Sequence, residues 1–189
     1  MKRAACLLLV VSSCREPAHH DGAPHERAAS MHAGSLATAP VAGHLAGTPF
    51  RMRAAWYRVV RRSGHERVDL FISEGRSGRL CGRPTASEAR QVLVRATGVR
   101  ALPTGEVRVT AATPTMQVSY EVPEEHGYEG VGGGEALVVF DAAEGTAVLG
   151  RLRACFPDAH KSCVEGTFRA EECRDELDFD GPRGGGQRR

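Results

Sequence analysis

The chain has 189 residues, of which 25 are Lys or Arg, 23 are Asp or Glu, and 41% are hydrophobic. This length suits one domain with a single apolar core, and we expect no second domain. The formal net charge is only +2, so the charge balance gives no argument for a nucleic-acid partner bound through its phosphates.

The N-terminal segment has the layout of an export signal. A basic start, Met1 to Arg3, precedes an apolar stretch at 4–13 that is far shorter than the ~20 residues of a membrane-spanning helix. We therefore expect residues 1–13 to be a signal peptide. Its removal takes away Lys2 and Arg3, which reduces 25 basic residues to 23, equal to the 23 acidic ones.

The four residues Val-Ser-Ser-Cys at 11–14 resemble a bacterial lipobox, although the first position of that motif is usually leucine. The resemblance implies that cleavage occurs before Cys14 and that this cysteine carries lipid, so that the protein reaches a membrane through a lipid anchor. Arg15 stands where the best-known inner-membrane lipoproteins have aspartate, which favours the outer membrane. An ordinary secretory signal cleaved a few residues later is the alternative, and it too takes the chain out of the cytoplasm.

The segments on either side of the expected domain contain few large apolar residues. Residues 14–38 are polar and without a period, and they are predicted to be a flexible tether; residues 175–189 are predicted to be a disordered tail. Imidazole side chains in the tether suggest copper or zinc binding as one hypothesis, with a solvated spacer as the simpler interpretation. The candidate metal ligands are His19, His20, His25 and His32.

From residue 39 to residue 174 the pattern is that of β-strands. Val68, Leu70 and Ile72 alternate with Asp69, Phe71 and Ser73, and residues 116–122 alternate in the same way. This period of two predicts strands with one face on a core and the other toward water. Two denser apolar runs, 92–94 and 137–140, predict central strands.

Turn signals separate these runs at short intervals, as in the segments 46–49 and 103–105. The spacing leaves no room for crossover helices. We therefore expect an all-β domain, a single antiparallel β-sandwich or barrel-like structure of about eight or nine strands. In the strand that contains Trp56 and Tyr57, we expect Trp56 to face the core and Tyr57 to face outward with neighbouring arginines.

Four cysteines remain once Cys14 is assigned to lipid. An even number in an exported domain favours disulfides. Cys155 and Cys163 flank a loop sequence, FPDAHKS, so a local bridge is expected there, which would pair Cys81 with Cys173. Structural zinc is the alternative, but the last three cysteines lack the close pairs that zinc sites use.

The whole layout resembles the small lipoproteins of myxobacteria, which have a lipobox, a polar tether and a β-rich domain. The resemblance rests on GHLAGTPF at 43–50 and GTFRAEEC at 166–173. It implies a fold and a compartment, and proteins of this kind generally lack an assigned activity.

The segment PEEHGYEGVGGGE, at 123–135, is expected to be the longest internal loop. Long loops on rigid sheets often carry binding residues. Glu124, Glu125, His126 and Tyr128 are therefore the candidates for a binding loop, and a hairpin connection without a ligand is the simpler alternative.

Nothing in the sequence has the spacing of a nucleophile elbow, and the domain's cysteines are expected to be oxidised. We expect no catalytic residues and no cofactor. The sequence thus favours a non-enzymatic binding or accessory module at the cell envelope, with the membrane and another envelope protein as partners and with no nucleic-acid partner. A periplasmic metal-handling protein that uses the tether histidines is the first alternative, and a small hydrolase is the second.

Overall fold

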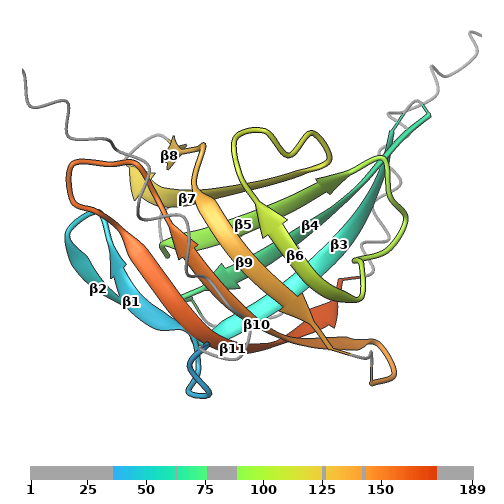
Figure 1. Cartoon of the computed structure of the whole chain (residues 1–189), viewed down its shortest axis with the longest axis horizontal. Coiled ribbons are helices and arrows are strands. Elements are labelled where there is room, and N and C mark those ends of the chain that lie inside the picture. Colours follow the sequence, from blue (N-terminus) through green and yellow to red (C-terminus); the bar gives the residue numbers. More distant parts are fainter. Residues whose placement is uncertain (1–35, 63, 76–88, 125–126, 142–143, 174–189) are drawn as a thin grey trace, which may run out of the picture. The chain divides into compact units, whose positions relative to one another are not determined.

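A computed structural model describes residues 36–173, except for residues 63, 76–88, 125–126 and 142–143 (Figure 1). The regular structure of these residues is entirely β, which confirms the predicted class. The described strands are β1 (Ala42–Leu45), β2 (Thr48–Arg51), β3 (Ala54–Arg62), β4 (His65–Ser73), β5 (Gln91–Thr97), β6 (Gly105–Val109), β7 (Met116–Glu124), β8 (Gly127–Val131), β9 (Glu135–Phe140), β10 (Ala147–Cys155) and β11 (Cys163–Glu172). No helix in the described part of the chain is long and apolar enough to cross a bilayer.

The strands form one sheet in the order β6-β9-β10-β11-β3-β4-β5-β7-β8, and the short β1–β2 hairpin pairs with β11 beside this path. The prediction of two packed sheets is not confirmed, because hydrogen bonds connect every described strand into a single curled sheet. Figure 1 shows β9, β10 and β11 crossing in front of β3, β4 and β5 as the sheet curls. It remains open, since β6 and β8 are the two ends of the order.

One seam of the sheet departs from the expected antiparallel pairing. Near its end β11 runs parallel to β3, with Glu171 opposite Trp56 and Glu172 opposite Tyr57. The other described strand pairings are antiparallel. Because β11 has ten residues, its first part can pair with β1 and its last part with β3.

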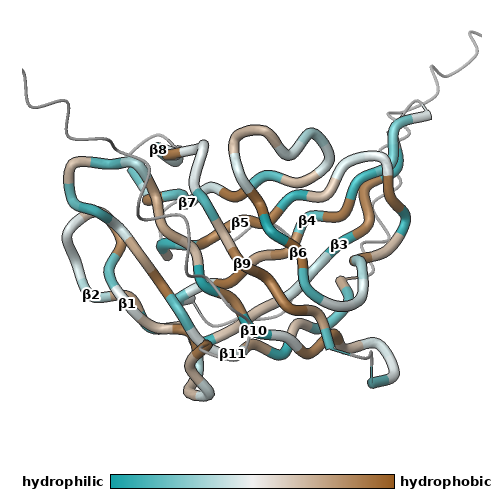
Figure 2. The backbone as a smooth tube through the Cα atoms, viewed as in Figure 1, coloured by the Kyte–Doolittle hydropathy of each residue, from teal (hydrophilic) through white to brown (hydrophobic). Residues whose placement is uncertain are grey.

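The main core lies on the inner face of the curl. Met116, Val118 and Tyr120 of β7 are buried and alternate with more exposed residues, as predicted. The dense apolar runs at 92–94 and 137–140 belong to β5 and β9, which have a neighbour on each side. Figure 2 shows apolar stretches along β4 and β5.

The outer face of β4 is also covered, so the prediction that it faces water is wrong. Asp69 and Ser73 are fully buried and Phe71 is 8% exposed. Phe71 stacks on Trp56, with 5.5 Å between the ring centroids, and both belong to a cluster with Leu93 that is separate from the main core. An alternating pattern does not reveal this cover, because the covering side chains come from neighbouring strands.

The expected sides of Trp56 and Tyr57 are therefore reversed. Trp56 is buried, but in the outer cluster, whereas Tyr57 packs against the main core. Phe71, Leu93 and Cys173 supply the apolar partners of Trp56 on the outer face, so this face of the strand is buried as well.

The β1–β2 hairpin has a two-residue turn at the predicted position 46–49. Ala46 and Gly47 both have positive φ, 50° and 75°, which is the conformation that tight hairpins require. The turn places Leu45 opposite Thr48.

Arg90 fixes this hairpin to the rest of the sheet. Its guanidinium donates to the carbonyl oxygens of Leu45, Thr48 and Pro49 at 2.6 to 3.2 Å. The same group makes a two-pronged ion pair with Glu74, at 2.7 and 2.9 Å. One side chain thus donates charged hydrogen bonds to three backbone carbonyls of the hairpin.

Candidate ligand-binding site

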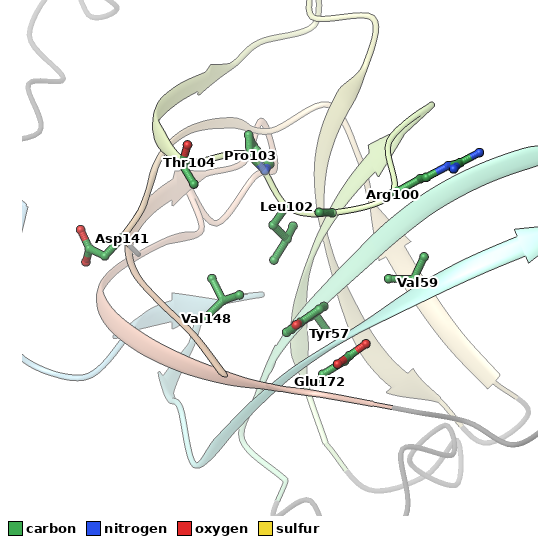
Figure 3. A pocket seen from close by; sticks show the side chains of 10 residues that line it. Tyr57, Val59, Arg100, Leu102, Pro103, Thr104, Asp141, Val148 and Glu172 are labelled. Atoms are coloured by element: carbon green, nitrogen blue, oxygen red, sulfur yellow. The ribbon is translucent and has the colours of Figure 1, made fainter. Parts of the chain in front are cut away.

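A pocket of about 250 Å³ lies between the β3 side of the sheet and the segment that leads into β6 (Figure 3). It is lined by Tyr57 and Val59 of β3, Val148 of β10, Glu172 of β11, Asp141 and the segment 100–104. It is therefore built where the parallel seam meets the inner face of the curl. Its volume lies just below the usual range of about 300–1,000 Å³ for small-molecule sites.

Apolar side chains form much of the pocket wall. Figure 3 shows Leu102 and Val148 directed toward the interior of the pocket, with Val59 on the β3 side. Val148 is 9% exposed and Leu102 is partly buried against the main core. This wall can remove an apolar group of a ligand from water. Such burial is favourable by a free energy of ~25 cal/mol per Å² of apolar surface buried.

Polar groups lie together at the β3–β11 seam. The Tyr57 hydroxyl donates to the carbonyl of Thr146 at 3.4 Å, and the backbone N–H of Glu172 donates to the same carbonyl at 3.0 Å. Tyr57 and Glu172 are paired in the sheet register, and Figure 3 shows their side chains next to each other. This part of the pocket can orient a ligand through hydrogen bonds.

Arg100 and Asp141 add charge at the edge of the pocket. The Arg100 side chain is 79% exposed and donates to Glu66 at 2.6 Å. Asp141 is exposed after the end of β9. The pocket thus combines an apolar wall with a few polar groups, which is the usual composition of a small-molecule site.

The disulfide Cys155–Cys163 closes the hairpin between β10 and β11, as the sequence predicts. Within its loop Asp158 accepts hydrogen bonds from the Tyr120 hydroxyl at 2.6 Å, from the Ser162 hydroxyl at 2.5 Å and from the Ser162 N–H at 2.8 Å. The Ser162 hydroxyl also accepts from the N–H of Ala46 at 2.8 Å. These bonds connect the disulfide loop to β7 and to the β1–β2 turn.

The same hydrogen bonds change two pKa values. Burial alone would raise the pKa of Asp158, but the hydrogen bonds from Ser162 and Tyr120 outweigh it and hold that pKa below its ordinary value. Burial, together with the bond to the Asp158 carboxylate, raises the pKa of Tyr120. Ser162 is fully buried, so its hydroxyl serves the structure and is closed to a substrate.

Most of the site residues predicted from the sequence lie outside the described residues. These are Cys14, Cys81, His19, His20, His25, His32, Glu125 and His126. Cys173 is disulfide-bonded, and its pairing with Cys81 stays a prediction. Within residues 36–173, without the gaps, no three His, Cys, Asp or Glu side chains are placed to hold a metal ion.

The expected long loop at 123–135 is mostly a hairpin. Pro123 pairs with Tyr128 and Glu124 with Gly127, so β7 and β8 occupy much of the segment. Glu124 is exposed and Tyr128 is half-buried. The prediction of a long loop is wrong because Tyr128 and Val131 suit a strand, and only residues 132–134 connect β8 to β9.

The pocket was not predicted from the sequence. Its residues come from separate elements, and none of them forms a local motif. The turn signal at 103–105 marks one edge of the pocket, but a turn signal alone does not indicate a cavity. The seam between β11 and β3, which brings Tyr57 and Glu172 together, joins residues more than a hundred positions apart in the chain.

No protein-family model matches this sequence, and the comparisons with curated proteins and with solved structures gave no match.

Proposed function

We propose that this chain is a lipid-anchored binding module of the cell envelope, which holds a small and largely apolar ligand in the pocket between β3 and the segment before β6. The pocket is the observation that carries the proposal, because it combines an apolar wall with hydrogen-bonding groups at the seam. The lipobox-like residues that end at Cys14 support an anchor, and Arg15 after them favours the outer membrane. The Cys155–Cys163 disulfide suits an oxidising compartment outside the cytoplasm.

A binding role agrees better with the site than a catalytic one. The hydroxyl of Ser162 does contact a carboxylate, but this residue is fully buried and bonded on two sides. The pocket itself offers Tyr57 and Glu172, which are paired in the sheet register and can orient a ligand through hydrogen bonds.

The pocket can be tested with two valines that are neighbours on β3. Val59 lines the pocket, whereas Val60 does not, and both are half-buried. We expect indole, a small apolar probe with one N–H donor, to shift the methyl resonances of Val59, Leu102 and Val148 saturably in NMR spectra. Val59→Trp should fill the pocket and weaken this binding about tenfold or more, because the side chain takes the place of the ligand.

Val60→Trp is the matched control, with the same substitution on the opposite face of the same strand. It should leave the affinity for indole within about twofold. Absence of saturable shifts in the wild-type chain, or equal effects of the two variants, would contradict the proposed binding site.

A further inference from the structure

Three arginines meet on one carboxylate at the outer face of β3, β4 and β5. Arg58 and Arg95 lie on either side of Asp69 in the sheet register, and Arg67 lies two residues away on the same strand. Arg58 and Arg67 both approach the Oδ2 atom of Asp69 at 3.3 Å, and Arg95 donates to Oδ1 at 2.9 Å. The three guanidinium groups are therefore gathered around a single point.

The burial of these groups shows which of them face the solvent. The side chain of Asp69 is 0% exposed, whereas those of Arg58, Arg67 and Arg95 are 21%, 38% and 34% exposed. The arginines thus cover the carboxylate. A molecule that approaches this face meets guanidinium groups and not the acid beneath them.

The positive charge of this cluster exceeds what Asp69 requires. One carboxylate against three guanidinium groups leaves a formal excess of +2, and the nearby Glu66 is already paired with Arg61 and Arg100. In addition, the Nε atom of Arg58 is buried and lacks a hydrogen-bond acceptor. The buried Nε atom of Arg67 has only the ion-pair contact with Asp69 Oδ2 at 3.3 Å. An added anion would balance this excess charge, and the solvent-facing parts of the three guanidinium groups can donate hydrogen bonds to it.

We propose that Arg58, Arg67 and Arg95 form a binding site for a phosphate monoester. A phosphate monoester carries a charge of about −1.5 to −2 at neutral pH, which matches the excess of the cluster. Guanidinium groups bind phosphate through paired N–H donors. Arg58 is also fixed over the ring of Phe71, 5.2 Å from its centroid, so one donor is held in place before the anion arrives.

The surface beside the cluster has room for the group that carries the phosphate. A hollow of about 290 Å³ adjoins Arg95, and Gln117, Ser119 and Thr113 line it with amide and hydroxyl groups. Its lining is separate from that of the pocket proposed above to bind an apolar ligand. The phosphate site does not depend on that function, and either can fail without the other.

Titration with inorganic phosphate tests the site directly. The Nε–H resonances of Arg58, Arg67 and Arg95 should shift saturably in NMR spectra of the full chain. The fluorescence of Trp56, the single tryptophan of the sequence, should change over the same concentration range because its stacking partner Phe71 lies under Arg58.

Three variants separate a phosphate site from a general effect of charge. Arg67→Gln, at the most exposed of the three arginines, should weaken phosphate binding about tenfold, as expected for the loss of a charged hydrogen bond. Asp69→Asn keeps the shape and raises the excess charge, so it should strengthen binding. Arg153→Gln is the matched control: Arg153 is 39% exposed, close to Arg67, and its Nε also lies beside a carboxylate, 3.6 Å from Glu165 Oε2, but this single partner balances its charge.

Vesicles distinguish a lipid headgroup from a free phosphate. Phosphatidylcholine vesicles that contain phosphatidic acid present a phosphate monoester, and those that contain phosphatidylglycerol present a diester. For each kind of vesicle, the quantity compared is the binding of the wild type against the binding of Arg67→Gln. Preference for phosphatidic acid, or binding of inorganic phosphate alone, would each support the site and identify the source. No saturable shift with phosphate, or equal losses for Arg67→Gln and Arg153→Gln, would overturn it.

Discussion

At the scale of single residues, Asp158 shows how one side chain can organise a loop. Its carboxylate accepts from Tyr120 and from both donors of Ser162, so it connects strand β7 to the disulfide-closed hairpin. The sequence marked this segment only as a loop between two cysteines. The bond to Tyr120 spans 38 positions in the chain, and spacing alone could not reveal it.

The lowered pKa of Asp158 predicts a pH dependence of stability. A carboxylate whose folded pKa lies below its unfolded value of about 3.9 stabilises the fold fully above that value, and this contribution is lost as the pH falls through the folded pKa. Asp158→Asn removes this contribution. We therefore expect the difference in unfolding free energy between wild type and Asp158→Asn to shrink as the pH is lowered from about 5 to about 2.

Urea unfolding at several pH values measures this difference. Tyr120→Phe is a useful companion, because it removes one donor to Asp158 and should move the acid transition of the protein part of the way toward that of Asp158→Asn. If wild type and Asp158→Asn differ by the same free energy at every pH, the assigned role of the Asp158 carboxylate is wrong.

At the scale of elements, the β1–β2 hairpin depends on a residue outside it. The hairpin has only four residues in each strand, and Arg90 supplies hydrogen bonds to three of its carbonyl groups. The turn itself was predictable from the sequence at 46–49. The contact with Arg90 was not, since it joins positions 41 to 45 residues apart.

Replacement of Arg90 by lysine tests this contact. Lysine keeps the positive charge near Glu74, but it lacks the planar guanidinium group, which pairs with Glu74 and donates to the hairpin carbonyls at the same time. We expect Arg90→Lys to lower the unfolding free energy by about 2–3 kcal/mol, the scale of one or two hydrogen bonds from a charged donor. Hydrogen exchange should also become faster at the amides of β1 and β2.

Arg153→Lys is the control, because Arg153 makes a partly exposed ion pair with Glu165 at 3.6 Å. Its cost should stay below about 1 kcal/mol. Equal effects of the two substitutions, or unchanged exchange in β1 and β2, would show that Arg90 does not hold the hairpin.

At the scale of the whole molecule, the strand class was readable from the sequence but the path of the sheet was not. Alternation placed β7 correctly, and dense apolar runs marked β5 and β9 as central. The same rule failed for β4, because Trp56 and Leu93 on neighbouring strands bury its outer face. Both the single curled sheet and the pocket depend on the β11–β3 seam, which follows from long-range packing and leaves no local signal.

We propose that the mature protein begins at Cys14 and reaches the membrane through lipid on that residue. Mass spectrometry of the N-terminal peptide, from chain produced in a bacterium that processes lipoproteins, tests it most directly. For the wild type we predict a peptide that starts at Cys14 and carries the added mass of acyl groups. For Cys14→Ala we predict that this peptide is absent and that the protein is lost from the membrane fraction. An N-terminus at another residue, or an unmodified Cys14 in membrane-bound protein, would contradict the claim.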